Sequence, residues 1–420
     1  MQSPASALEW QFKALTDIWT GNLDRHGNRL IPTGLIGSIR WWLEILVRGL
    51  GGKACDPTSP ERCPGHNKKP TEPGHRCVVC ELFGCTGWAR KFRLMILDSQ
   101  GNVIQGQIRA NTEFTLRFIP LRPIRDEEWC LLDLTLRLIA DYGAIGGKTV
   151  LKPSDEWGLA DLGAEDFEEQ NAQVRVRHAR QSLPLREGDI IKEVGNRDIY
   201  TLSDLQSELL GKQHGERIEV TVLRGEQGSW IEKQMECWIG KRHHQDFGLI
   251  SYEQGPPHWK CEKSCEHLKN YVAQPQWRKA PHTYDEQGCR HDFSWASLEN
   301  FWCVKGRYLA RQDADKSTFN AVIGRKQPKN EAQELEQDND INRWLAGRQQ
   351  ESKKVFSFKH PEEGGRTFGF VKPPTVDFEK IKTRLGNVWT GFNSNNEFKD
   401  GRVILDELCR QKDSPHGGTP

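Results

Sequence analysis

Cysteine and histidine residues lie close together between positions 55 and 85. They are the usual zinc ligands of proteins, and Cys77-x-x-Cys80 places two thiolates on one tight turn. The stretch from Pro57 to Pro73 contains almost no apolar residue, so it has no core of its own, and a bound metal commonly stabilises such a segment. We therefore predict a structural zinc site. The predicted ligands are Cys63, Cys77, Cys80 and Cys85, and the alternatives for Cys63 are Cys55, His66 and His75.

A second group of metal-ligand residues follows later in the chain, with looser spacing. Its members are Cys261, Cys265, His267, Cys289 and His291. The chain has 12 cysteines but no charged-then-apolar N-terminal signal, so we expect a cytoplasmic protein whose cysteines are thiols and metal ligands rather than disulfides. No apolar run approaches the roughly 20 residues of a membrane span, and we expect no membrane contact.

One carboxylate, Asp24, lies in a polar loop over residues 20–29 that is rich in glycine and asparagine. A strand over Leu8–Thr16 precedes this loop. After it, apolar residues recur at helical spacing, and Thr33 or Ser38 can cap the predicted helix, which carries Arg40. A strand, a loop and a helix in this order bring backbone N–H groups and a guanidinium to one phosphate. Simple turn chemistry is the alternative explanation of Asp24.

Further elements indicate an α+β fold. Residues Phe92–Asp98 and Glu113–Pro120 read as strands, and Trp129–Ala140 reads as a packed helix. Strand, helix, two strands and helix form the ferredoxin-like pattern, which RNA-recognition sheets share. The glycine-rich loop Gly143–Thr149 follows, and on its own it is typical of a helix stop.

Formal charge is unevenly distributed. Residues 153–236 contain 18 acidic and 10 basic residues, a local charge of −8, so the rest of the chain carries +9 to reach the total of +1. A basic body suits a polyanionic ligand, and the acidic segment suits contact with protein.

Three motifs give the chain a resemblance to a known family. The run IPTGLIGSIRWWLEILVRG, the segment Cys80–Cys85 (CELFGC) and the loop Tyr142–Thr149 (YGAIGGKT) resemble, in family order, the signature of the RAMP superfamily, the RNA-binding subunits of type III CRISPR complexes. The resemblance implies guide and target RNA and other protein subunits as partners. It also implies a catalytic Asp24 that assists attack of a target-RNA 2′-hydroxyl on its phosphodiester, either directly or with a divalent metal such as magnesium. The RNA contacts it implies are Gly37, Ser38, Arg40, Gly146, Gly147 and Lys148.

In this family the glycine-rich loop runs directly into a strand, but here the matching continuation comes at His243–Ser251. The intervening segment therefore reads as an insertion. Its latter half, Leu183–Gln227, resembles a PDZ domain, whereas residues 153–182 lack the carboxylate-binding loop. We expect a docking or shape-filling module rather than a peptide binder.

The predicted organisation has three parts. Residues 1–152 form the first part of the RAMP core with a zinc knuckle at 55–85, residues 153–240 form a PDZ-like insertion, and residues 241–420 form the second part of the core. In the last part, Trp277–Lys279 and Trp302–Arg311 are predicted to clamp RNA, and Gly364-Gly365-Arg366 resembles the family's basic closing segment.

The predicted function is a backbone subunit of a type III CRISPR ribonucleoprotein that grips guide RNA and cleaves target RNA through Asp24. The insertion suggests a terminal or specialised position in the complex. Three alternatives stay open: a non-catalytic structural subunit, a stand-alone endoribonuclease that processes guide precursors, and an unrelated PDZ scaffold.

Overall fold

The structure, a computed structural model, has two compact units, Met1–Val150 with Asp246–Pro420 and Leu151–Gln245. No described helix has the length and apolar composition that a membrane span requires. The described residues are 6–21, 29–56, 62–65, 67–146, 158–179, 183–210, 212, 217–226, 228–240, 247–278, 283–284, 290–291, 295–310, 317–326, 334–347 and 352–411.

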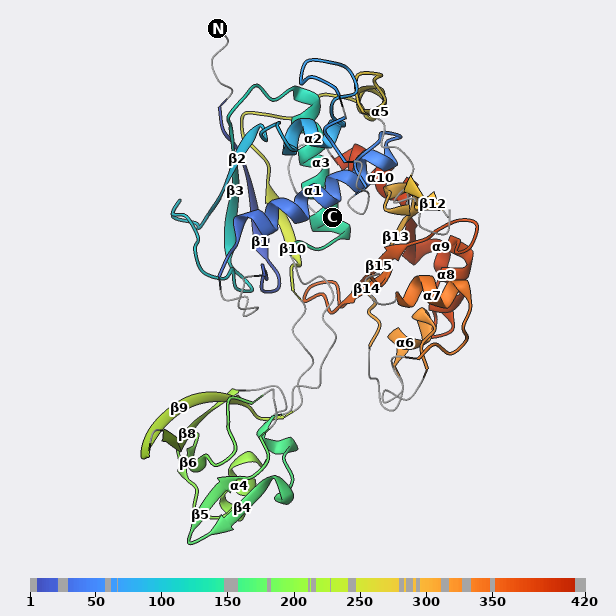
Figure 1. Cartoon of the computed structure of the whole chain (residues 1–420). Coiled ribbons are helices and arrows are strands. Elements are labelled where there is room, and N and C mark those ends of the chain that lie inside the picture. The colour runs from blue at the N-terminus through green and yellow to red at the C-terminus, as the bar shows by residue number, and fades with distance from the viewer. Residues whose placement is uncertain are drawn as a thin grey trace. The chain divides into compact units, whose positions relative to one another are not determined.

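The first half of the larger unit is a ferredoxin-like βαββαβ fold (Figure 1). Its antiparallel sheet has the order β10-β1-β3-β2, in which the last strand of the motif lies at the edge beside the first. The predicted α+β fold class is confirmed. The elements are β1 (Leu8–Ala14), α1 (Pro32–Gly49), α2 (Val78–Phe83), β2 (Phe92–Leu97), β3 (Glu113–Pro120), α3 (Asp126–Tyr142) and β10 (Ile250–Gln254).

Residue spacing explains how these elements bury one core. In β3, Phe114, Leu116 and Phe118 alternate onto the buried face of the sheet. The buried residues of α1 recur at helical spacing, and α1 and α3 pack on the same face of the sheet. A buried hydrogen bond of 2.8 Å from Trp10 Nε1 to Asp133 Oδ1 links β1 to α3.

The C-terminal half of the same unit repeats this topology, which we did not predict. Its sheet has the order β14-β15-β13-β16 and is also antiparallel, so the first and third strands again lie side by side in the centre. The elements are η4 (Leu298–Asn300), β13 (Phe301–Lys305), α6 (Thr318–Ile323), α7 (Asp340–Ala346), β14 (Val355–Phe358), β15 (Arg366–Phe370), α8 (Phe378–Gly386), α9 (Ser394–Glu397), β16 (Phe398–Asp400) and α10 (Gly401–Gln411).

Two disulfides connect the halves, contrary to our expectation of thiols. Cys130 of α3 bonds to Cys261, and Cys265, the first residue of α5 (Cys265–Val272), bonds to Cys409 of α10. Both bonds thus end in the five-residue segment 261–265. Cys261 and Cys265 are therefore not available as ligands in the second group of metal-ligand residues, because their sulfurs are already bonded. Cys289 lies outside the described residues, as does the His291 side chain, although β11 (Thr283–Tyr284) and β12 (Arg290–His291) form a short hairpin.

The smaller unit has a core of its own. Its sheet follows the path β4-β5-β6-β8-β9, with β7 paired to β6, and α4 starts with a capping box formed by Thr201 and Asp204. The elements are η1 (Leu159–Asp161), η2 (Ala164–Asp166), β4 (Phe167–Gln170), β5 (Gln173–Val176), β6 (Ile190–Val194), β7 (Arg197–Asp198), α4 (Leu202–Leu209), β8 (Arg217–Glu226) and β9 (Ser229–Trp238).

The chain leaves and re-enters the larger unit at adjacent positions. Ile145 N donates to Gly248 O over 2.8 Å, and Gly248 N donates to Asp17 O over 2.9 Å. Gly248 has a φ of +83°, and an added Cβ would lie 1.9 Å from Ile145 O, so only glycine fits at this crossing. Ends held this closely make the insertion of a folded module inexpensive.

Replacing residues 151–245 with a short Gly/Ser linker is expected to leave the larger unit folded. The core of each unit is its own, and the loop closure needed is already made by the contact between Ile145 and Gly248. Thermal unfolding should shift by only a few degrees, because doubling a loop changes its closure free energy by about 0.6 kcal/mol. Calorimetry of the shortened chain and of isolated residues 151–245 measures whether each unit unfolds cooperatively and at which temperature. Loss of cooperative unfolding in the shortened chain would contradict the prediction.

Candidate functional site

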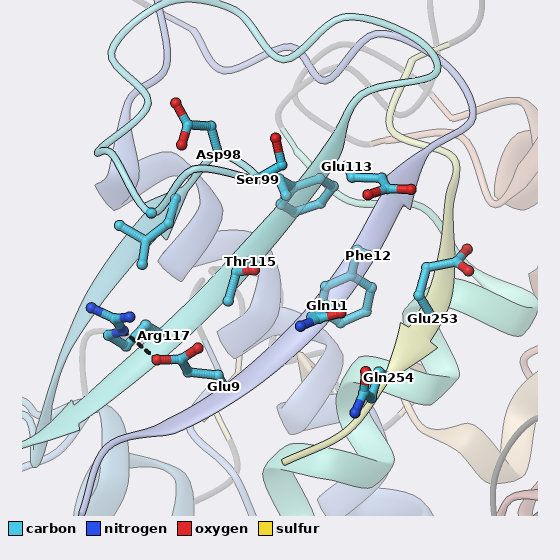
Figure 2. Close-up of a pocket in the computed structure, with 13 residues that line it drawn as sticks. Glu9, Gln11, Phe12, Asp98, Ser99, Glu113, Thr115, Arg117, Glu253 and Gln254 are labelled. Carbon is cyan, nitrogen blue, oxygen red and sulfur yellow. Dashed lines mark hydrogen bonds and ion pairs between the residues drawn. The ribbon is translucent and has the colours of Figure 1, made fainter. Parts of the chain in front are cut away.

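The solvent-facing side of the first sheet carries carboxylates (Figure 2). A cavity of about 530 Å³ on this face is lined by Glu9, Asp98, Glu113 and Glu253, with Arg117 as the basic residue in its lining. Arg117 Nε is paired to Glu9 Oε1 at 2.5 Å. Sheets that bind RNA present aromatic and basic side chains on this face. The carboxylates of this face would repel RNA phosphates.

The N-terminal end of α1 is open. Ile31 is the N-cap residue, without a side-chain hydrogen bond to the helix, Pro32 occupies the first turn, and that turn has no acidic residue. Gly34 N and Leu35 N already donate to Ile31 O, so this end offers an anion chiefly the positive end of the helix dipole. The helix thus begins at Pro32, before both predicted caps, because proline is pre-organised for the first helical position.

This start changes the role of two predicted RNA contacts. Gly37 and Ser38 lie in the second turn, where N–H groups bond to carbonyls four residues earlier, so their amides are not open to a ligand. Gly37 is exposed, and an added Cβ would meet no protein atom within 4 Å, so this position leaves space at the helix surface. The Ser38 hydroxyl accepts a hydrogen bond of 3.0 Å from Gly146 N.

The glycine-rich loop therefore lies against α1, as the RNA-binding hypothesis requires. Gly146 has a φ of +106°, and an added Cβ would lie 2.6 Å from Trp19 O, so this position needs glycine. Gly147 and Lys148 lie outside the described residues.

The two ends of the loop that carries Asp24 are joined beside the start of α1. Thr20 Oγ1 accepts from Ile31 N over 2.7 Å and donates to Arg29 O over 3.1 Å. Asp24 itself lies outside the described residues. Arg29, exposed at this base, was missed by the sequence reasoning, although its place as a basic residue directly before the helix was a usable signal.

Arg40, another of the six predicted RNA contacts, does not point to this surface. Its guanidinium donates to Glu44 Oε1, to Gly84 O and to Cys80 Sγ, at 3.0, 3.0 and 3.1 Å. Burial lowers the pKa of Arg40, but Cys80 and Glu44 outweigh that effect and raise it, so the group stays charged. The structure thus uses Arg40 to join α1 to a cysteine cluster.

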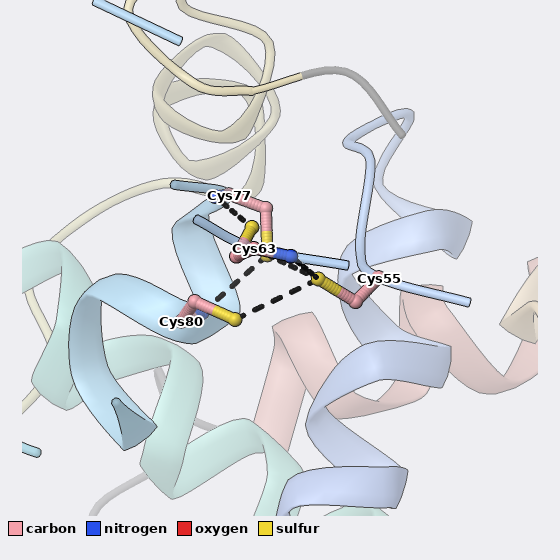
Figure 3. Close-up of side chains that lie close together, drawn as sticks. All are labelled: Cys55, Cys63, Cys77 and Cys80. Carbon is pink, nitrogen blue, oxygen red and sulfur yellow. Dashed lines mark hydrogen bonds between the residues drawn. The ribbon is translucent and has the colours of Figure 1, made fainter. Parts of the chain in front are cut away.

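That cluster consists of Cys55, Cys63, Cys77 and Cys80, all buried (Figure 3). Their sulfur atoms lie within 4.8 Å of one another, and Cys55 Sγ is 3.8 Å from Cys77 Sγ and 3.7 Å from Cys80 Sγ. Four thiolates bonded at about 2.3 Å to a tetrahedral metal stand roughly 3.8 Å apart, so this donor set fits a metal such as zinc. Four protein ligands leave no open position for a substrate, which indicates a structural site.

Local structure aims these sulfurs. Cys77 caps α2, accepting from Cys80 N, and backbone N–H groups also point at Cys63 Sγ and Cys55 Sγ. Arg48, two turns after Arg40 on α1, donates to Cys55 O over 2.7 Å. Two cations on one helix thus face a site whose metal and four thiolates would carry a charge of −2.

The predicted ligand set differs from the cluster at one member. Cys63, Cys77 and Cys80 are brought together, but the fourth sulfur is that of Cys55, which we had kept as an alternative, instead of Cys85. The chain leaves α2 through Gly84 at a φ of +87°, and Cys85 N then bonds to Trp88 O in a turn of its own. His75 is not part of the cluster, and His66 lies outside the described residues.

In the smaller unit, the turn before edge strand β4 uses its own carboxylates. Gly163 N donates to Asp166 Oδ2 over 3.0 Å, and Leu202 N at the start of α4 donates to Glu169 Oε2 over 2.8 Å. These two amides are therefore not available to a peptide terminus.

In the larger unit, Trp302 of the RNA clamp predicted at Trp302–Arg311 is fully buried, so its ring is not available to stack on a base.

Comparison with known proteins supports the assignment of both domains. Residues 11–151 match the RAMP superfamily, and residues 160–232 match the PDZ domain family. No curated protein matches the sequence.

Two solved structures show similarity at low identity. Cmr1 from Pyrococcus furiosus, in its apo form, is 12% identical with a TM-score of 0.22, over 33% of this chain and 45% of Cmr1, so the match spans less than half of that protein. A chain of the type III-B Cmr-beta complex, solved by cryo-EM with cognate target RNA and AMPPnP, is 9% identical with a TM-score of 0.34, over 97% of this chain and 99% of the other. Residues 11–151 thus resemble the RAMP superfamily, and β10 completes their βαββαβ order after a segment that resembles a PDZ domain.

Proposed function

We propose that this chain is an RNA-binding subunit of a type III CRISPR ribonucleoprotein, which grips guide RNA beside the open end of α1 and cleaves paired target RNA through Asp24. The hydrogen bond from Gly146 N to Ser38 Oγ carries the proposal, because it joins the glycine-rich loop to α1 next to the base of the Asp24 loop. The match of residues 11–151 to the RAMP superfamily supports it.

The grip would be independent of RNA sequence. The first turn of α1 offers an amide and the helix dipole to a phosphate, and Gly37, where an added Cβ would meet no protein atom, lets the RNA backbone approach closely. Gly146 lets the glycine-rich loop pack against Trp19 beside this surface. Arg29 and Lys148 would supply charge, and Arg40 is assigned to the cysteine cluster instead. We also propose that zinc occupies the cysteine cluster and, through Arg40 and Arg48, holds α1 in place.

Asp24 would act on the target strand. Its carboxylate would orient the 2′-hydroxyl and take its proton while that oxygen attacks phosphorus; the bond from phosphorus to the 5′-oxygen breaks, and the 5′-oxygen takes a proton from water. Alternatively, the carboxylate would hold a divalent metal such as magnesium. The products would end in a 2′,3′-cyclic phosphate and a 5′-hydroxyl.

Substituting Asp24→Ala in the assembled complex is expected to slow target cleavage by about 10²-fold or more, the usual size of a general acid–base contribution, without changing RNA affinity. Asp24→Asn keeps the shape and should lose the same activity. Asp406→Ala, at an exposed acid on α10, is the matched control. Cleavage at the wild-type rate in both Asp24 variants would show that Asp24 does not cleave the target, and the chain would then be a non-cleaving RNA-binding subunit. Cleavage of guide precursors by the isolated chain would favour a processing enzyme.

A further inference from the structure

Side chains of the C-terminal half of the larger unit reach the root of the glycine-rich loop: Glu407 accepts a hydrogen bond from Tyr142, and Arg366 bonds to the loop itself. Arg366, the first residue of β15, is 1% exposed. Its Nη1 donates to Ala140 O over 2.7 Å and to Gly143 O over 3.0 Å. These are carbonyls at the C-terminal end of α3, where a helix leaves acceptors unpaired and its dipole is negative, so a guanidinium is well placed to cap it.

Each residue of the loop from Gly143 to Gly146 makes a hydrogen bond to a residue outside the loop, which we call its anchor. Trp42 Nε1 donates to Ala144 O over 2.9 Å, Ile145 N donates to Gly248 O, and Gly146 N donates to Ser38 Oγ. These three anchors lie in the first half. The fourth, on Gly143 O, is Arg366 from the second half, so the loop is fixed at its root by the repeated domain.

Arg366 is itself held in place. Its Nη2 donates to Glu363 Oε1 over 3.2 Å and lies 3.0 Å from His360 Nε2. Burial, followed by the charge of Arg366, lowers the pKa of His360 to about 4, so this imidazole is neutral and does not repel the guanidinium. Lys305 Nζ, on β13, lies 3.4 Å from Glu363 Oε1 and balances that carboxylate from the other side.

We propose that Arg366 is a positioning residue for RNA binding: by capping α3 from the second ferredoxin-like half, it fixes the glycine-rich loop that meets the RNA backbone. This inference rests on the proposed function. The sequence places Arg366 only in a segment, Gly364-Gly365-Arg366, that resembles the family's basic closing segment, and assigns it no role. A guanidinium at 1% exposure, with both terminal nitrogens engaged inside the protein, has no face for a phosphate.

The test compares Arg366→Met and Arg366→Lys with wild type in two measurements on the full chain. Hydrogen exchange without RNA reports the amides of Gly143, Ile145 and Gly146, and the affinity for a defined single-stranded RNA is measured across a salt series. We expect Arg366→Met to speed exchange at these amides about tenfold and to weaken RNA binding about tenfold, with Arg366→Lys in between. The slope of log affinity against log salt should stay unchanged, because Arg366 contacts no phosphate.

Arg384→Met is the matched control. Arg384 also caps a carbonyl, donating to Val322 O over 2.8 Å, but within the second half only. It should change neither the loop amides nor RNA affinity. If Arg366→Met does not fold, Glu363→Gln tests the same anchor with a smaller effect, because it keeps the acceptor but removes the negative charge that pairs with Arg366 at a half-buried position.

The outcomes separate this inference from the proposed function. Unchanged exchange in the Arg366 variants would overturn the inference, as would a salt slope lower by about 0.7 with unchanged exchange, which marks a direct phosphate contact. Faster exchange in a chain whose wild type binds no RNA would overturn the proposed function while confirming the anchor.

Discussion

Replacing Cys80 with serine is expected to abolish the zinc binding that we propose for the cysteine cluster and to unfold the chain between α1 and β2. Within this connection, residues 57–73 contain almost no apolar residue, and the buried cluster of Cys55, Cys63, Cys77 and Cys80 ties the segment to α2. Structural zinc contributes apparent binding energies on the order of 10–16 kcal/mol in small domains, so its loss exceeds what the local packing of this segment supplies. Metal content by mass spectrometry and hydrogen exchange over residues 53–91 measure the effect.

The effect should extend to α1. Arg40 donates to Cys80 Sγ and Arg48 to Cys55 O, so the helix that begins at the proposed RNA surface is tied to the cluster at two points. Without the metal, we expect α1 to keep its apolar packing on the sheet but to lose these two ties. A chelator applied to wild type should reproduce the exchange pattern of Cys80→Ser.

Cys85→Ser is the control, because Cys85 lies beside the cluster but outside it. It should retain one zinc, whereas Cys55→Ser should lose it. The reverse result, zinc kept in Cys55→Ser and lost in Cys85→Ser, would contradict the cluster and restore the ligand set predicted from sequence. A native chain without zinc would remove the proposal altogether.

The sequence predicted what depends on local spacing. The Cys77-x-x-Cys80 knuckle and the alternation Phe114, Leu116, Phe118 were read correctly, because neighbouring residues alone determine them. The choice between Cys55 and Cys85 depends on a positive φ at Gly84 and on where α1 ends, and neither follows from ligand spacing.

Long-range contacts explain the other differences. Arg40 was assigned to RNA because a basic residue on a helix after a loop suits phosphate, yet the fold places Cys80 beside it from 40 residues away. The second ferredoxin-like half was missed because β13 and β16 are separated by almost a hundred residues that read as loops and isolated pieces. The periodicity of apolar residues identifies single strands but does not show that β13 pairs with β16.

The second large effect is expected from the disulfides. Cys261→Ser and Cys265→Ser each open one bond, between partners 131 and 144 residues apart. For loops of this length, a disulfide removes unfolded-state entropy worth about 5 kcal/mol in the chain-entropy account. Because the loops 130–261 and 265–409 do not overlap, the two losses should be close to additive, and the double variant should lose most of the stability of an ordinary domain. Denaturant unfolding of the single and double variants measures this.

Reduction should separate the two bonds. Cys130 and Cys261 are buried, at 0% and 3% exposure, whereas Cys265 and Cys409 are half-buried. A thiolate must reach the sulfur it attacks, so a dithiol should open the Cys265–Cys409 bond in the native chain and the Cys130–Cys261 bond only on unfolding. Cys303→Ala, at a buried cysteine with a free thiol, is the control and should cost far less than either serine variant. Alkylation of the denatured, unreduced chain should leave Cys130, Cys261, Cys265 and Cys409 unlabelled; labelling of all four would show that neither bond exists.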